Sequence, residues 1–201
     1  MGVEVYRDTS GVDPVGIGAI LATCDLGEIK GVRDYAILRL LWGNALRRGE
    51  VSGTNVGDFR SQESKLWIKG KGKIQKSTID LPPKTVIAIG SWLEMRSLCL
   101  GIPTATDPLF IGLGNDRHSR LLGEGIRLML VERTKAAGIT KVMSPHRVRH
   151  SAITAFLDAS GGDVRSAQGL SRHKNLNTLT RYDDNRHQYQ AKASSMLEDL
   201  V

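Results

Sequence analysis

A histidine and an arginine that could bind a phosphate stand three residues apart, at His146 and Arg149. Ser144 is a favoured N-cap residue and Pro145 suits a first helical position, so a helix is predicted to begin there. Residues i and i+3 share one helix face, and a helix N-terminus favours anions. An imidazole and a guanidinium in this place suit an anionic phosphate. A solvated basic helix start would have the same sequence, so the motif alone leaves both readings open.

Four more regions carry side chains that could bind or attack a phosphate. They contain Arg47 with Glu50, Lys71 between two glycines, His173, and Tyr182 nine residues later. Each has an ordinary explanation: a surface arginine pair, a hairpin tip with solvated lysines, a polar turn, and a tyrosine packed beside Leu179. Taken one at a time, these signals do not define a site.

Two other chemistries are not supported by the sequence. His146 and His150 have the spacing of a zinc-protease pair, but Arg147 stands where the glutamate is needed and would repel a dication. The run at residues 70–77 is no P-loop, because Gln75 replaces the second glycine. We therefore expect no metal and no bound nucleotide cofactor.

The elements that must position these residues are mostly helical. Apolar spacing and capping residues predict helices from Ile17 onward, over 31–48, 85–100, 122–137, 144–160 and 163–170, and in two further stretches to the end. Short β-prone runs at 56–59, 66–68 and 77–79 predict a small antiparallel sheet. The expected class is mainly α with a small antiparallel β-sheet (α+β), in one domain after a loose lead-in at residues 1–16.

The composition favours a polyanionic partner. Lys and Arg total 28 against 21 Asp and Glu among 201 residues, a net charge of +7, and such an excess most often serves nucleic acid binding. Hydrophobic residues make up 40%, enough for a core. The two cysteines are far apart, which fits a reducing cytosol. No apolar run approaches the roughly 20 residues of a membrane span and no signal-peptide pattern is present, so a cytoplasmic location is expected.

In their order and spacing, these residues resemble the tyrosine recombinase (phage integrase) family from Ile17 to Tyr182. The block at residues 144–151 is similar to the family's most recognisable motif, residues 33–38 to its first helix block, and residues 178–182 to its nucleophile segment. Two positions depart from the pattern. Ala45 stands where the family usually has glycine, and Ser171-Arg172 stands where it usually has Leu-Gly before the second histidine.

The resemblance implies a tyrosine recombinase catalytic-domain architecture and site-specific DNA recombination through a covalent 3′-phosphotyrosyl intermediate, without metal or ATP. It assigns the catalytic roles to Arg47, Lys71, His146, Arg149, His173 and the nucleophile Tyr182. Arg47 and Arg149 would hold the phosphate oxygens, Lys71 would protonate the leaving oxygen, and His146 would be the general base or its positioner. His173 would donate a hydrogen bond to the phosphate. Glu50 would orient a basic neighbour, and Arg172 would add a phosphate contact.

The resemblance also implies double-stranded DNA as partner and a homotetramer on it. Residues 183–201 would form a C-terminal helix that docks on a neighbouring subunit or packs on its own domain. Residues 17–201 would be the catalytic domain, without the N-terminal core-binding domain of the family, either as an excised domain or as a short member. Two alternatives remain: type IB topoisomerase-like DNA relaxation, and a DNA-binding module that has lost catalysis. The target site, and a role in integration, excision or chromosome resolution, stay open.

Overall fold

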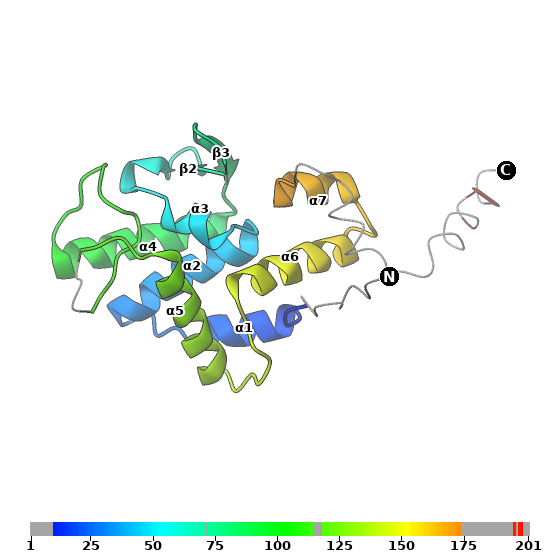
Figure 1. The fold of residues 1–201 in the computed structure, drawn as a ribbon, viewed down its shortest axis with the longest axis horizontal. Coiled ribbons are helices and arrows are strands. Elements are labelled where there is room, and N and C mark those ends of the chain that lie inside the picture. The colour runs from blue at the N-terminus through cyan, green and yellow to red at the C-terminus, as the bar shows by residue number, and fades with distance from the viewer. Residues whose placement is uncertain (1–9, 71, 115–117, 174–194, 196, 199–201) are drawn as a thin grey trace, which may run out of the picture. The chain divides into compact units, whose positions relative to one another are not determined.

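The computed structural model describes residues 10–70, 72–114, 118–173, 195, 197 and 198 (Figure 1). The chain divides into two compact units, Met1–Ala152 and Ile153–Val201. The first contains α1 (Pro14–Ala22), α2 (Ile29–Gly43), α3 (Arg48–Ser52), η1 (Val56–Asp58), β1 (Phe59–Arg60), β2 (Lys65–Ile68), β3 (Ser77–Asp80), α4 (Pro83–Leu100) and α5 (Gly123–Ala136). The boundary falls within α6 (Pro145–Ala159), and α7 (Val164–Ser171) lies in the second unit. The predicted class, mainly α with a small antiparallel sheet, is confirmed.

Two helix boundaries differ from the prediction. Helix α1 begins at Pro14 rather than Ile17, because the Asp13 carboxylate accepts a hydrogen bond from the Gly16 amide and Pro14 occupies the first turn. The helix predicted over 31–48 is two helices, since α2 ends at Gly43 and α3 begins at Arg48. The break contains Ala45, whose φ is 46°. A left-handed alanine ends a helix that apolar spacing alone would continue.

The sheet has the order β1-β2-β3 and is antiparallel throughout. Leu66 pairs with Phe59 on one side and Ile79 on the other. The first predicted strand is mainly the 3-10 turn η1, which leaves two residues for β1. Lys76 Nζ contacts both carboxylate oxygens of Asp58, at 2.7 and 2.5 Å, so the end of the β2–β3 hairpin is tied to η1.

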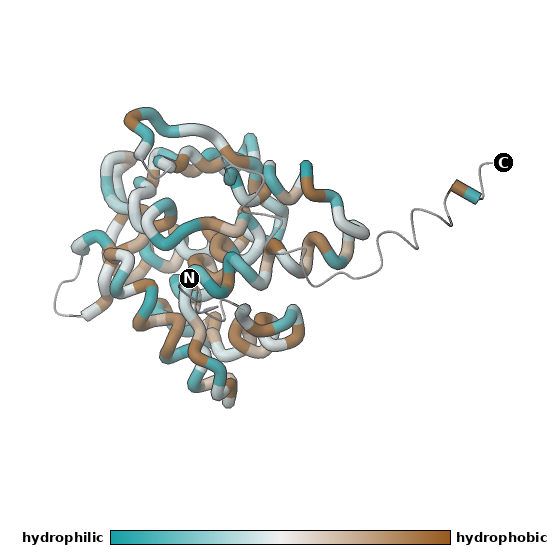
Figure 2. The backbone as a smooth tube through the Cα atoms, turned by 45° about the vertical axis from the view of Figure 1, so that its right-hand side comes forward, coloured by the Kyte–Doolittle hydropathy of each residue, from teal (hydrophilic) through white to brown (hydrophobic). Residues whose placement is uncertain are grey.

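The core of the first unit lies between α2 and α4. Leu40 and Leu41 of α2 and Ile89 and Trp92 of α4 are fully buried. Along the helices, hydrophobic and hydrophilic segments alternate, as helices that bury one face require (Figure 2). None of the helices in the described part of the chain is both long and apolar enough to cross a membrane.

A buried charge cluster joins α2 to α5. The Asp34 side chain is 0% exposed, and each of its oxygens accepts two hydrogen bonds from one guanidinium, Oδ1 from Arg33 and Oδ2 from Arg133. Arg133 also donates to the carbonyl of Thr23 at the end of α1. Because every oxygen of Asp34 is paired, the cluster fixes three helices relative to one another.

Candidate phosphate-binding site

Arg47 is held at the start of α3 by Glu50. The Glu50 carboxylate is 3% exposed and accepts hydrogen bonds from the Arg47 backbone amide at 2.9 Å and from Arg47 Nη1 at 2.8 Å. The Arg47 side chain is 35% exposed, so the guanidinium is fixed on one edge and accessible on another. The pairing of Arg47 with Glu50 that the sequence indicated is present in the structure.

Arg149 reaches the same turn from α6. The residue is 2% exposed, and its Nη1 donates a hydrogen bond to the carbonyl oxygen of Ala45. Ala45 is itself fully buried, so a hydrogen bond from the Arg149 side chain to the main chain of a residue 104 positions earlier brings the two arginines together. The N-terminus of α6, which carries Arg149, is capped as predicted, since Ser144 Oγ accepts a hydrogen bond from the Arg147 amide at 3.3 Å.

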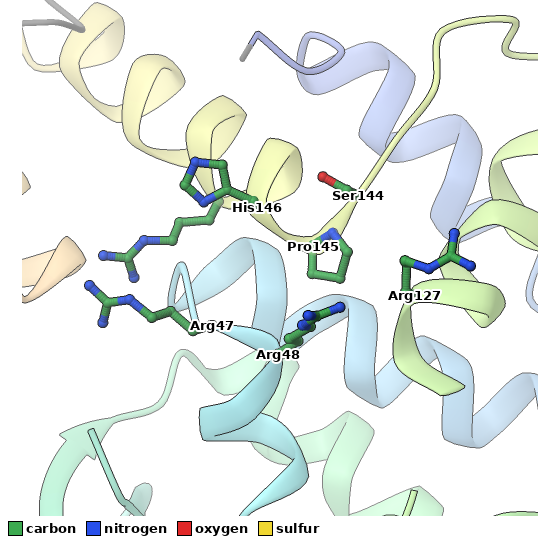
Figure 3. A pocket seen from close by; sticks show the side chains of 7 residues that line it. Arg47, Arg48, Arg127, Ser144, Pro145 and His146 are labelled. Carbon is green, nitrogen blue, oxygen red and sulfur yellow. The ribbon is translucent and has the colours of Figure 1, made fainter. Parts of the chain in front are cut away.

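A pocket of about 370 Å³ opens where these elements meet. Its lining residues come from α3, α5 and the start of α6: Arg47, Arg48, Arg127, Ser144, Pro145, His146 and Arg149. Figure 3 shows Arg47 and Arg48 extending from the start of α3 in opposite directions, Arg47 to the side of His146 and Arg48 toward α5. Among the described residues, the lining contains four guanidinium groups and no carboxylate, so it suits an anion.

His146 is exposed on the first turn of α6 and lies beside the pocket arginines. Desolvation of the ring and the positive charges of Arg149 and Arg47 lower the pKa of His146 below its ordinary value of 6.5. The imidazole is therefore neutral near pH 7, with one ring nitrogen able to accept a proton. A neutral imidazole near two guanidiniums can act as a general base toward a hydroxyl group.

Sequence reasoning did not identify Arg127 as a site residue. It lies on α5 and reaches the pocket from a region between the recognised motifs. The available signal was its partner, Glu124, three residues earlier on the same helix, because the pair predicts that this face of α5 is charged. Such pairs are common on surface helices, so the signal had no specificity for a site.

The remaining candidate residues lie in the second unit or outside the described residues. Arg172 and His173 belong to the second unit, where Arg172 caps α7 in a left-handed conformation with φ 56° and its amide donates to the Gln168 carbonyl at 2.7 Å. Gln168 Nε2 donates to the His173 carbonyl at 3.1 Å. Lys71, Tyr182 and nearly all of the segment 183–201 lie outside the described residues.

Three comparisons point to one class of protein. The sequence profile described as the phage integrase family matches residues 12–189. The chain is 50% identical over 199 residues to tyrosine recombinase slr0733 of Synechocystis sp., covering 98% of the chain and 62% of that protein. It is 32% identical over 158 residues to tyrosine recombinase XerC of Syntrophus aciditrophicus, with 77% of the chain and 50% of that protein covered. The chain thus spans less than two thirds of the length of these relatives.

Solved structures agree with the fold. The crystal structure of XerA recombinase superposes with a TM-score of 0.72 at 26% identity, over 93% of this chain and 65% of that one. XerH site-specific recombinase, bound to a palindromic difH substrate in a post-cleavage complex, also gives a TM-score of 0.72. Its identity is 22%, over 96% of this chain and 54% of that one, so it supports the fold alone.

Proposed function

The chain belongs to the phage integrase family, and from that premise we propose that it is the catalytic part of a site-specific DNA recombinase. The reaction is cleavage and rejoining of DNA strands through a covalent 3′-phosphotyrosyl intermediate. Type IB topoisomerase activity and a purely DNA-binding role are less favoured, because the named relatives are tyrosine recombinases. The pocket lined by Arg47, His146 and Arg149 is the single observation that carries the proposal.

The scissile phosphate is proposed to bind against the guanidiniums of Arg47 and Arg149. In the pentacoordinate transition state the non-bridging oxygens gain negative charge. Two planar donor groups therefore stabilise the transition state more than they stabilise the ground state. Glu50 holds Arg47 in orientation from the side away from the solvent. His146, neutral near pH 7 because its pKa is lowered, is placed to accept a proton.

Tyr182 is the proposed nucleophile. A tyrosine hydroxyl ionises near pH 10, about three units above neutrality, so ionising it costs roughly 4 kcal/mol in water. Positive charge around the phosphate lowers that cost, and His146 takes the proton. The Tyr182 oxygen forms a bond to phosphorus while the bond to the 5′-oxygen breaks, and Lys71 protonates that oxygen. His173 donates a hydrogen bond to the phosphate, and Arg172 adds a contact to the DNA backbone.

The covalent intermediate retains the phosphodiester energy, so a 5′-hydroxyl from a second strand can reverse the reaction with a new partner. Neither ATP nor a metal ion enters this scheme. The proposed substrate is double-stranded DNA, the proposed assembly is a homotetramer on it with residues 183–201 docked on a neighbouring subunit, and the proposed location is the cytoplasm.

A covalent-adduct assay tests the proposal. The protein is incubated in EDTA with nicked DNA fragments that were selected from a random library by binding, and is then denatured. We expect a protein–DNA adduct with Tyr182 and none with Tyr182→Phe. Measurable DNA binding without an adduct would contradict the proposal. Relaxed plasmid without recombinants, in a parallel reaction on supercoiled DNA that carries two selected sites, would favour the topoisomerase alternative.

A further inference from the structure

A second group of charges lies on the α5 side of the pocket. Arg48, directly after Arg47, and Arg127 on α5 both line the pocket. Both are oriented toward one carboxylate, Glu124, which accepts from Arg127 Nε at 2.9 Å and from Arg127 Nη2 at 2.7 Å. The Arg48 Nη1 to Glu124 Oε2 distance is 4.0 Å. Two guanidiniums therefore share one carboxylate, which leaves an excess positive charge beside the pocket.

The Arg48 side chain is placed by close packing on α5. A Cβ atom at Gly123 would lie 3.2 Å from Arg48 Cδ and 3.4 Å from Arg48 Nε. Glycine at this position lets the Arg48 stem cross the first turn of α5, which carries its head group toward Glu124 and Arg127. The Arg48 stem thus packs against the first turn of α5, and its head group is at the surface.

In these ion pairs another anion can easily replace the Glu124 carboxylate. The side chains of Arg48, Arg127 and Glu124 are 54, 40 and 61% exposed, and exposed pairs of this kind contribute little to stability. The hydrogen bonds from Arg127 hold the pKa of Glu124 below its ordinary value, so the carboxylate stays charged. A DNA phosphate offers the same charge with more acceptor oxygens, and a guanidinium fork fits either anion.

We propose that Arg48 and Arg127 bind a second backbone phosphate of the DNA, beside the one at Arg47, His146 and Arg149, and that Glu124 competes with it. The inference rests on the proposed function, since it requires DNA at this pocket. In this proposal Glu124 weakens DNA binding. Without DNA its carboxylate neutralises part of the charge of Arg48 and Arg127, and the DNA phosphate must displace it. Both arginines are expected to act through charge rather than through base recognition.

The test measures DNA affinity against salt concentration, with all variants made in the Tyr182→Phe background so that no covalent product forms. Arg48→Gln and Arg127→Gln are each expected to weaken binding about equally for all sequences, and to reduce the slope of log affinity against log salt by about one. Glu124→Gln is expected to raise affinity about two- to five-fold, as loss of a weak surface competitor implies.

Glu132→Gln is the matched control. Glu132 is also on α5, is similarly exposed and pairs at 2.6 Å with Lys30, but does not line the pocket. It is expected to leave both affinity and slope close to those of the background protein. If Glu124→Gln behaves like Glu132→Gln, the competition is absent. If Arg127→Gln changes the preference at one base pair without changing the slope, the contact is to a base and the proposal is overturned.

The two proposals fail separately. The Tyr182 protein could give no adduct while the arginine variants show the expected slopes and Glu124→Gln the expected gain in affinity. That result would support the second phosphate site and contradict strand cleavage. Conversely, an adduct together with unchanged slopes in both arginine variants would support strand cleavage and contradict the second phosphate site.

Discussion

Four residues other than glycine adopt a left-handed conformation in the described part of the chain, and two of them, Ala45 and Arg172, lie in turns that precede a candidate catalytic residue. Ala45, with φ 46°, comes two residues before Arg47, and Arg172, with φ 56°, comes directly before His173. These are the two positions at which the sequence departs from the usual glycines of the family. The backbone conformation that glycine favours is therefore kept although the glycines are absent.

The turns differ in what holds them in that conformation. Ala45 is fully buried and its carbonyl accepts from Arg149, so tertiary packing fixes it. Arg172 is partly exposed and makes two contacts with its own helix end, where its amide donates to the Gln168 carbonyl and its Nη1 to the Leu170 carbonyl. The first turn should therefore depend on global stability, and the second on the local stability of α7.

The largest expected effect comes from breaking the buried charge cluster on α2, the helix that leads into the first turn. Asp34→Ala removes a fully buried carboxylate and leaves Arg33 and Arg133 without their shared partner, which should cost about 3–5 kcal/mol of unfolding free energy. Urea unfolding followed by circular dichroism measures it. A loss below about 1 kcal/mol would mean that the arginines find other partners and that α2 is not fixed by this cluster.

A smaller and local effect is expected at the second turn. The Asp163 carboxylate caps α7 by accepting from the Ser166 amide at 2.9 Å. Asp163→Ala should cost about 1 kcal/mol and should increase hydrogen exchange in α7 while leaving α2 protected. An equal loss of protection from hydrogen exchange in α2 and α7 would contradict the expectation that the second turn depends only on the local stability of α7.

Restoring glycine compares the two turns directly. Relief of left-handed strain is worth about 1–2 kcal/mol per residue. At Ala45 part of it is offset by the loss of a buried methyl group, worth about 0.8 kcal/mol. At Arg172 part is offset by the loss of the hydrogen bond from Nη1 to the Leu170 carbonyl, worth about 0.5–1.5 kcal/mol. Each substitution should therefore change the free energy of unfolding by less than about 1 kcal/mol in urea unfolding. A larger loss at either position would show that its side chain contributes more than the left-handed strain costs.

The smallest expected effect is electrostatic and concerns His146, whose pKa is lowered in part by Arg47, the arginine that follows the first turn. Below pH 6.5 the unfolded chain protonates His146 more readily than the folded chain, so this residue makes stability fall as pH drops below 6.5. NMR titration of the folded protein should give a His146 midpoint below 6.5. Arg47→Gln should move it upward, since one repelling charge is removed, and an unchanged midpoint would exclude Arg47 as a cause.

The sequence predicts the elements of the first unit better than the breaks between them. The helices that became α4, α5 and α6 follow from apolar spacing and from caps such as Gly138 and Ser144. The start of α1 was missed although Asp13-Pro14 is a capping pair, because both residues were assigned to the lead-in. The predicted helix runs past the end of α2 for a different reason: apolar spacing continues to Leu46, and the stop signal of Gly43-Asn44 is passed over in favour of Gly49.

The candidate site was predictable where its residues lie in compact motifs. Arg47 with Glu50, and His146 with Arg149, were identified from local spacing, and the structure brings them to one pocket. Arg48 and Arg127 were not, because their common location depends on how α3 packs against α5. Packing between distant segments leaves no local signal in a single sequence.

The contact between Arg149 and the Ala45 carbonyl also has a consequence for the protein during its synthesis. A growing chain that has released Arg47 from the ribosome still lacks Arg149 until about 100 further residues have been made. Pro145 and His146, which line the same pocket, emerge only just before it. An incomplete chain therefore carries no assembled arginine pocket, and a prematurely terminated product that ends before residue 145 lacks the wall that α6 supplies.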